Sequence, residues 1–357
     1  MTGDPDDGTR DGRGRRVPRV VVAPDKFRGT VDAAQAAAAM AEAATVLGWE
    51  AVVLPMSDGG EGLLDACAQV CPDVVSTAVS GPDGAPVVAE WRCADGLAVV
   101  ESARASGLVL AGGAEGNDPM TATTRGTGEL LLAAAREVGP GGTVVVGLGG
   151  SATTDGGLGA VDAVMEAGGL DGVALVIACD VDVPFVDAAT RFAAQKGAGP
   201  DAVSELAARL DRLVDEYRGR FGIDVRWLPG AGAAGGLGGG LVALGGVLRS
   251  GYTLVRDLVG LSAALDAADR VVTGEGALDA TSFAGKVVGG VVADARGRAL
   301  PTLVVAGRCS PDGESGARAA GCDVVSLTER FGPGPARSDT ASCIRAATVA
   351  WLGPSGR

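Results

Sequence analysis

The stretch Gly147-Leu-Gly-Gly-Ser-Ala-Thr-Thr-Asp-Gly-Gly157 follows directly after the run Thr143-Val-Val-Val146. A short, valine-rich run of this kind is typical of a buried parallel strand. The glycines that follow let the backbone approach a ligand closely, and their N–H groups can point at an anion. The two segments together indicate an α/β fold with a phosphate-binding loop at the end of a strand.

The same succession of apolar run, polar loop and helix occurs towards both ends of the chain. Such alternation predicts a doubly wound, mainly parallel sheet, in which ligands bind at the carboxyl ends of the strands. The expected strands are 19–23, 51–54, 268–273, 302–306 and 322–326, and the expected helices are 32–47, 287–298 and one that begins at Leu63.

The middle of the chain has a different pattern. Residues 74–100 contain short β-rich pieces separated by turns, which predict antiparallel hairpins. Strands are then expected at 143–146, 173–179 and 223–228, with an amphipathic helix from Pro200. We therefore expect two α/β domains, with the middle one inserted into a Rossmann- or flavodoxin-like domain built from both chain ends. The expected boundaries are 1–17 for a disordered tail, 18–76 and 255–357 for the discontinuous domain, and 77–254 for the inserted domain with the glycine-rich loops.

Composition excludes several classes of protein. The 357 residues carry a net charge of −14, which argues against non-specific binding to nucleic acid. The sequence contains no histidine, so histidine-based catalysis and histidine metal sites are excluded. No apolar run is long enough to cross a membrane, and the N-terminus does not resemble a signal peptide. Seven cysteines without CxxC spacing indicate free thiols and a reducing cytoplasm.

A second glycine-rich run, 230–240, contains Gly230-x-Gly232-x-x-Gly235 and matches the dinucleotide fingerprint. The acidic residue that should end the next strand is missing, since Asp257 has the spacing but lies in a helix-like segment. NAD binding is therefore the least favoured role for this run. Two other roles stay open, a phosphate-binding turn and tight helix packing. Gly285-Lys286 resembles the end of a P-loop, but Val287 replaces the residue that binds Mg²⁺, so it is not a Walker A motif.

Acidic residues recur after the expected strands, where parallel strands would place them at one edge. A single carboxylate after a strand is commonly a helix cap, but several beside glycine loops suit Mg²⁺ and a hydroxyl nucleophile. A carboxylate can also accept the hydroxyl proton during phosphoryl transfer. Cations in the same loops can hold a carboxylate or a phosphate. These cations are Arg28, Arg125, Lys196 and Lys286.

Further segments form an ordered set over about residues 18–330. They are Val22-Ala-Pro-Asp-Lys-Phe-Arg-Gly-Thr30, Asp58-Gly-Gly-Glu-Gly62, Ala105-Ser-Gly107, Gly126-Thr-Gly-Glu-Leu130, Gly147–Gly157, Ala178-Cys-Asp-Val-Asp182, Gln195-Lys-Gly-Ala198, Gly230–Gly238, Thr273-Gly-Glu-Gly276, Leu278-Asp279 and Gly285-Lys286. In this order the chain resembles the type I glycerate kinases. The resemblance implies two α/β domains with a cleft between them, and phosphorylation of D-glycerate that depends on ATP and Mg²⁺, with 2-phosphoglycerate as the expected product.

The resemblance suggests roles for individual residues, which we state as a hypothesis for a cytoplasmic monomer or homodimer without nucleic-acid or membrane partners. Asp155 is ambiguous, because it can bind Mg²⁺ or cap the next helix. The candidates are Asp180, Asp182 and Lys196 for catalysis; Asp155 and Asp180 for metal; Asp25, Arg28, Asp58, Glu61, Glu275 and Asp279 for substrate; and Gly149, Gly150, Ser151, Thr153, Gly232 and Gly235 for nucleotide phosphates.

Some loops depart from the family pattern. Lys26 and Arg28 replace Ser and Lys of the first motif, Ala277 replaces Arg or Gln, and residues 183–186 and 193–194 also differ. The changes in the loops 26–28 and 277–283 favour one alternative, a kinase for another small hydroxy acid. A second alternative is a ligand-binding member of the family that does not catalyse the reaction.

Overall fold

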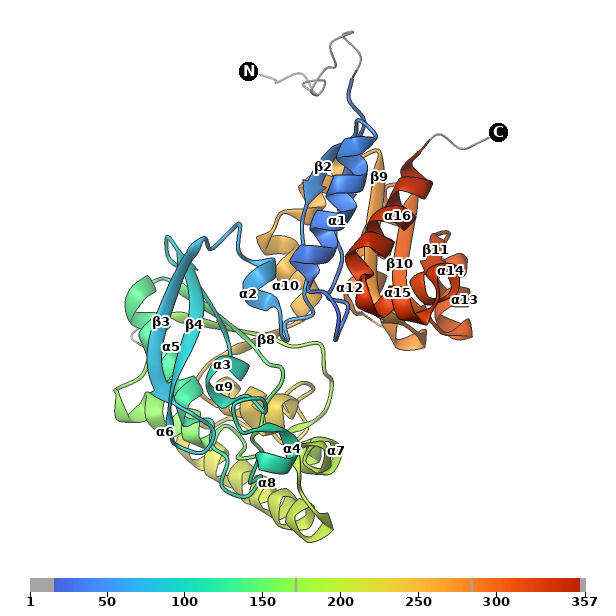
Figure 1. Cartoon of the computed structure of the whole chain (residues 1–357). Helices are drawn as coiled ribbons and strands as arrows, with labels where there is room; N and C mark the ends of the chain where they lie inside the picture. Colours follow the sequence, from blue (N-terminus) through green and yellow to red (C-terminus); the bar gives the residue numbers. More distant parts are fainter. Residues whose placement is uncertain (1–15, 171, 284, 354–357) are drawn as a thin grey trace. The chain divides into compact units, whose positions relative to one another are not determined.

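The computed structural model describes residues 16–170, 172–283 and 285–353 (Figure 1). The chain forms two compact units, one made of residues 1–57 and 259–357 and the other of residues 58–258. We call them the outer unit and the inserted unit. The units divide at 57/58 and 258/259, whereas the boundaries expected from the sequence are 76/77 and 254/255. Residues 1–15 of the expected tail lie outside the described residues.

The outer unit contains a parallel five-stranded sheet with the order β11-β10-β9-β1-β2. The chain leaves β1 in one direction along the sheet and returns on its other side, so the order reverses between β1 and β9. Ligands of doubly wound sheets bind beyond the carboxyl ends of the strands at such a reversal. The strands are β1 (Arg19–Val22), β2 (Glu50–Val53), β9 (Arg270–Leu278), β10 (Thr302–Cys309) and β11 (Asp323–Ser326).

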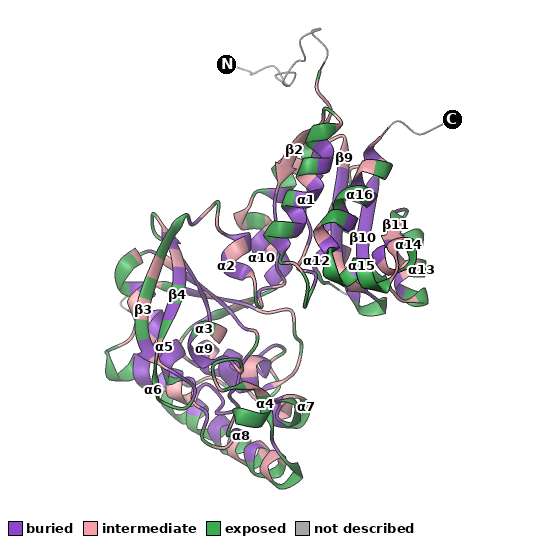
Figure 2. Cartoon of the chain, viewed as in Figure 1, coloured by how far each residue is buried: buried purple, intermediate pink, exposed green. Residues whose placement is uncertain are grey.

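Helices cover both faces of this sheet. On one face α1 (Ala33–Val46) and α16 (Thr340–Leu352) pack on alternate residues of β1, β9 and β10, and α12 (Val287–Arg296) and α13 (Pro311–Ala319) pack on the other. Asp32 begins α1 with a reciprocal capping box to Gln35. Figure 2 shows β9 and β10 largely buried beside helices with exposed outer faces. The shorter helices are α11 (Leu261–Asp266), η4 (Ala280–Phe283), α14 (Leu327–Phe331) and α15 (Pro333–Ser338).

The inserted unit contains a six-stranded sheet with the order β3-β4-β5-β6-β7-β8. The pairs β3–β4 and β4–β5 are antiparallel, which confirms the predicted hairpins, and β5 to β8 are parallel. The prediction of an α/β fold with two mainly parallel sheets is therefore confirmed. The strands are β3 (Asp73–Ser80), β4 (Pro86–Ala94), β5 (Leu97–Glu101), β6 (Thr143–Gly147), β7 (Ala174–Ala178) and β8 (Val247–Arg249).

One face of this second sheet packs against α5 (Arg125–Val138), α6 (Leu158–Glu166) and α9 (Leu237–Ala243) around Trp91 and Leu130. The long helix α8 (Pro200–Phe221) forms a separate apolar cluster with the loops around Phe185. Proline at its first position and glycine after its last residue explain its clear ends. The remaining helices are α2 (Leu63–Ala66), α3 (Ala103–Ser106), α4 (Gly113–Gly116), η1 (Phe185–Asp187), α7 (Ala188–Phe192), η2 (Ala194–Lys196), η3 (Ala233–Gly236) and α10 (Gly251–Leu258).

Two local predictions are wrong. Residues 223–228 form no strand; Val225 is buried, but the segment packs as irregular backbone against the cluster around α8. The acidic segment 274–279 is not simply a loop after a strand, because β9 continues to Leu278. Its pairing with β10, which includes Ala306 with Glu275, explains the extension. No helix in the described ranges is long and apolar enough to cross a membrane.

Candidate active site

In the inserted unit, the loop 58–62 packs directly on the ends of β6 and β7. A Cβ atom at Gly59 would lie 2.8 Å from the Cβ atom of Ala178, and one at Gly147 would lie 2.6 Å from the carbonyl oxygen of Gly59. A Cβ atom at Gly149 would lie 2.8 Å from the Cα atom of Gly60. The three segments therefore meet backbone to backbone, and any side chain at these positions would push them apart.

Asp58 and Asp180 are brought together at this edge. The carboxylate of Asp180 accepts hydrogen bonds from the N–H groups of Gly251 (2.8 Å) and Tyr252 (3.1 Å) at the start of α10. Burial raises the pKa of the Asp180 carboxyl above its usual range, and the charge of Asp58 contributes to this rise. The hydrogen bonds to the carboxylate act in the opposite direction. Asp182 is exposed two residues further along. The arrangement offers carboxylate oxygens from two neighbouring loops.

The carboxylates of Asp58 and Asp180 suit Mg²⁺ better than they suit a metal ion whose ligands all come from the protein. Among the residues that the structure describes, no group of three or more acidic or cysteine side chains could hold a metal ion. Mg²⁺ is usually bound through one or two carboxylates, with waters and substrate phosphates completing its shell. Asp58 and Asp180 match that donor set.

The glycine loop 147–157 is accessible only at its beginning. Gly149 is half-buried and Gly150 is exposed, whereas Ser151 and Thr153 are buried. The Ser151 and Thr153 hydroxyls lie 3.0 Å apart, and the N–H of Thr153 donates to Oγ of Ser151 at 3.1 Å. Gly149 and Gly150 can therefore contact a ligand, while the two hydroxyl residues shape the loop from inside.

Asp155, the ambiguous residue of this loop, is 2% exposed and fully engaged within the protein. Its Oδ2 accepts from the N–H and the hydroxyl of Thr124 at 2.8 Å each and from the N–H of Gly159 at 3.3 Å. Its Oδ1 accepts from the N–H of Gly157 at 3.0 Å. These contacts around the start of α6 favour the capping role over the metal-binding role.

Lys196 lies behind the glycine loop and is 5% exposed. Its Nζ donates to the carbonyl oxygen of Thr153 at 2.6 Å. Burial lowers the pKa of Lys196 to about 8, although the negative charge of Asp155 opposes the shift. Nδ2 of Asn117 donates to the carbonyl oxygens of Ala152 and Lys196, at 3.0 and 2.8 Å. Lys196 thus supports the glycine loop through the backbone of Thr153.

The second glycine run packs against the first. A Cβ atom at Gly232 would lie 2.3 Å from the carbonyl oxygen of Pro184, and one at Gly235 would lie 1.9 Å from that of Thr153. Both glycines are buried, so the contacts favour tight packing, one of the two open interpretations. Asp257 lies in α10 and pairs with Arg249 and Arg256, so it does not stand at a strand end as an NAD site requires.

In the outer unit, Asp25 and Glu275 lie at the reversal between β1 and β9. The N–H of Asp25 donates to the carbonyl oxygen of Gly274 at 2.9 Å, which places Asp25, in the segment after β1, beside the part of β9 that carries Glu275. Nζ of Lys26 is 3.9 Å from Asp25, and Arg28 is exposed in the same segment. The fold therefore brings together two substrate-binding candidates from opposite ends of the chain.

Glu275 and Asp279 have different protonation behaviour. Burial raises the pKa of Glu275 to about 7, and the charge of Asp25 contributes; Oε1 of Glu275 is buried without a hydrogen-bond partner in the described part of the chain. Asp279 is exposed, and hydrogen bonds from the hydroxyl and N–H of Thr281 lower its pKa. Glu275 can therefore hold a proton near neutral pH, whereas Asp279 offers a carboxylate.

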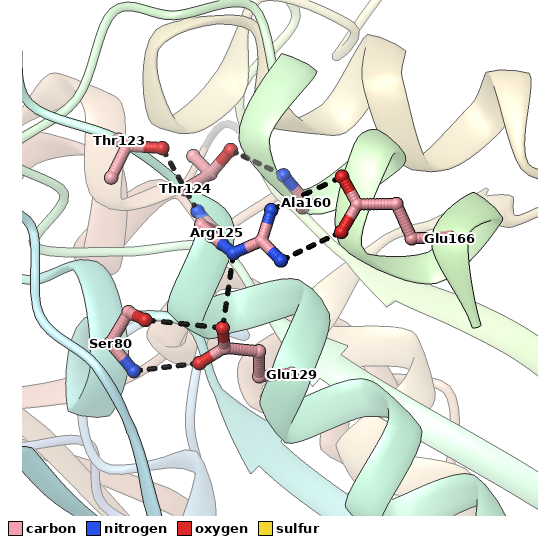
Figure 3. Close-up of polar contacts among 7 residues, drawn as sticks. All are labelled: Ser80, Thr123, Thr124, Arg125, Glu129, Ala160 and Glu166. Carbon is pink, nitrogen blue, oxygen red and sulfur yellow. Dashed lines mark hydrogen bonds and ion pairs between the residues drawn. The ribbon is translucent and has the colours of Figure 1, made fainter. Parts of the chain in front are cut away.

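The contacts of two further residues, Arg125 and Glu101, were not evident from the sequence. Arg125 forms a network with Glu129 and Glu166 on α5 and α6, so its charge is already paired (Figure 3). Glu101, at the end of β5, is a buried carboxylate that contacts the loop 58–62. Nothing in the sequence distinguished it from an ordinary helix cap.

The comparison with known proteins agrees with this geometry. The model of the Glycerate kinase family matches residues 20–166 and 165–344. The chain belongs to the glycerate kinase family. It is 35% identical to glycerate 2-kinase of Escherichia coli K12 over 331 residues, covering 82% of this chain and 86% of the relative. It is 34% identical to glycerate kinase of Bacillus subtilis 168 over 331 residues, with the same coverage.

A solved structure supports the fold of this glycerate kinase family member. The crystal structure of a protein described as a glycerate kinase 2 from Salmonella typhimurium LT2 superposes with a TM-score of 0.78 at 30% identity, covering 94% of this chain and 98% of the other. The resemblance inferred from the ordered motifs and the prediction of an enzyme of the kinase class are confirmed.

Proposed function

We propose that this enzyme transfers the γ-phosphoryl group of ATP to D-glycerate in the presence of Mg²⁺ and forms 2-phosphoglycerate. The observation that carries the proposal is the pair Asp58 and Asp180 beside the accessible Gly149 and Gly150, at the carboxyl ends of parallel strands. A metal-binding edge next to a phosphate-binding backbone is what phosphoryl transfer needs. The names of the Escherichia coli and Bacillus subtilis relatives support the substrate.

Each group of the inserted unit has a distinct proposed role. Asp58 and Asp180 would hold Mg²⁺, which when bound neutralises charge on the phosphates. The N–H groups of Gly149 and Gly150 would contact phosphate oxygens. Asp182, which is exposed, would accept the proton of the attacking hydroxyl. Glu61, exposed on the same loop as Asp58, would contact a glycerate hydroxyl.

In the outer unit, the proposed role is recognition of glycerate. Arg28 would hold the carboxylate, and Asp25 and Asp279 would accept hydrogen bonds from hydroxyls. Glu275, with its pKa near 7, can donate a hydrogen bond when protonated and accept one when ionised. Seven free thiols fit our proposal of a cytoplasmic enzyme.

The direct test is an assay with D-glycerate, ATP and Mg²⁺. ADP should form only when all three are present, and ³¹P NMR should identify the ester as 2-phosphoglycerate. Absence of ADP with folded protein would refute the glycerate proposal. A panel of other small hydroxy acids would then test the alternative kinase, and a ligand-induced rise in Tm without turnover would support a binding protein.

A further inference from the structure

Glu101 is a charged side chain that the proposed roles do not use. It is the last residue of β5 and is 3% exposed. Its Oε1 accepts from the N–H groups of Gly62 (2.9 Å) and Leu64 (3.2 Å), and its Oε2 accepts from Nε of Arg104 (3.4 Å). A buried carboxylate is tolerated only when donors surround it. Glu101 has three such donors, two of which belong to the loop and helix that follow Asp58.

The contacts constrain the loop 58–62 at its end. The N–H groups at the start of α2 have no carbonyl partner within the helix, so they need an acceptor from elsewhere. Glu101 supplies it. The other end of the loop is confined by Gly251, where an added Cβ atom would lie 2.0 Å from the carbonyl oxygen of Asp58. The loop that carries Asp58 is therefore held at both ends.

We propose that Glu101 is a positioning residue for phosphoryl transfer: it holds the loop 58–62 on the ends of β6 and β7 and so keeps Asp58 beside Asp180. Glu101 does not itself contact the reacting groups. Arg104, which is on the next turn, orients the carboxylate of Glu101. The inference rests on the proposed function for its kinetic consequence, but the contact between Glu101 and the loop can be tested without any substrate.

Glu129 provides a matched control in the same unit (Figure 3). It accepts from the N–H (2.7 Å) and hydroxyl (3.1 Å) of Ser80, and its Oε1 is 3.2 Å from Nε of Arg125. Like Glu101, it joins backbone N–H to an arginine on a neighbouring turn. It fixes the end of β3, however, and does not contact the loop 58–62.

The first experiment compares steady-state kinetics of Glu101→Gln, Glu101→Ala and Glu129→Gln. Glutamine keeps an acceptor oxygen and alanine does not, so kcat should fall about tenfold in Glu101→Gln and about a hundredfold in Glu101→Ala. Glu129→Gln should lose stability without a comparable loss of kcat. Equal losses of kcat in the glutamine variants, or wild-type kcat in Glu101→Ala, would overturn the proposal.

The second experiment measures amide hydrogen exchange in the protein without ligands. Exchange at Gly62 and Leu64 should be about tenfold faster in Glu101→Ala than in the wild type, and unchanged in Glu129→Gln. Unchanged exchange at both amides in Glu101→Ala would refute the anchoring of the loop. If exchange responds as expected but the wild type does not phosphorylate glycerate, the anchoring stands and the substrate proposal fails.

Discussion

Replacing Gly235 by alanine should separate a packing role from a ligand-binding role. The φ angle of Gly235 is +71°, and the new Cβ atom would lie 1.9 Å from the carbonyl oxygen of Thr153 and 2.8 Å from the Cα atom of Thr154. Both are backbone positions, so no side-chain rotation can relieve the overlap. Gly245 is the matched control, because its φ is +91° and nothing lies within 4 Å of its Cβ position.

Both substitutions place an L-residue in the left-handed region, but only Gly235→Ala also causes a steric overlap. An L-residue in the left-handed region costs about 1 kcal/mol, so Gly245→Ala should lower the free energy of unfolding by about that amount. Overpacking adds about 1–3 kcal/mol, which brings the loss for Gly235→Ala to about 2–4 kcal/mol. Urea denaturation followed by circular dichroism measures both variants, and similar m-values allow the midpoints to be compared.

The outcome tests the interpretation of the second glycine run. If Gly235→Ala is no less stable than Gly245→Ala, the close approach to Thr153 does not constrain the fold. If Gly235→Ala keeps wild-type stability but no longer binds ATP, the run acts through the ligand and our packing interpretation is wrong.

Three further changes address other parts of the molecule. Asp182→Asn should lower kcat about 10²- to 10⁴-fold at unchanged Tm, and near wild-type turnover would remove Asp182 from the mechanism. Because burial lowers the pKa of Lys196 from 10.5 to about 8, the unfolded chain binds more protons between these values, and stability should rise with pH there. The variant Lys196→Met should not show this rise in stability, which is at most about 3 kcal/mol. Urea-derived stability curves that run parallel for the wild type and the variant at pH 7–10 would contradict this reasoning. Arg270→Gln should cost about 1–2 kcal/mol, because the guanidinium lies 5.3 and 5.0 Å from the rings of Trp49 and Trp351; an unchanged urea midpoint would refute that estimate.

The alternation of strands and helices was predictable because buried parallel strands are short apolar runs with clear ends. Residues 19–22 and 143–147 are examples. The extension of β9 through Glu275 was not predictable. Glycines flank Glu275, and this part of the strand forms by pairing with β10, which the local sequence does not show. The apolar residues of 223–228 were also misleading, because they pack in the cluster around α8 without forming a strand.

Candidate site residues were predictable by type and position but not by role. Asp58 follows β2 and Asp180 follows β7, which belong to different sheets, so parallel topology alone does not bring them together. The close packing of the loop 58–62 on Ala178 does so. Whether Gly232 and Gly235 face a phosphate or a carbonyl depends on what approaches them, and no local pattern contains that information. Lys196 and Asp155 show the same difficulty, since a charged residue in a loop is not expected to be buried until its partners are known.

The discontinuous outer unit affects how the chain is made. Strand β1 lies between β2 and β9, and the pairing of Val20 with Arg270 joins residues that are synthesised far apart in time. At about 5–20 residues per second, the ribosome needs tens of seconds to deliver β9 after β1 has emerged. The inserted unit is continuous in sequence and can complete its sheet during that interval. The valines of β1 must wait with one edge unpaired, so conditions that slow synthesis lengthen the period in which the nascent chain can aggregate.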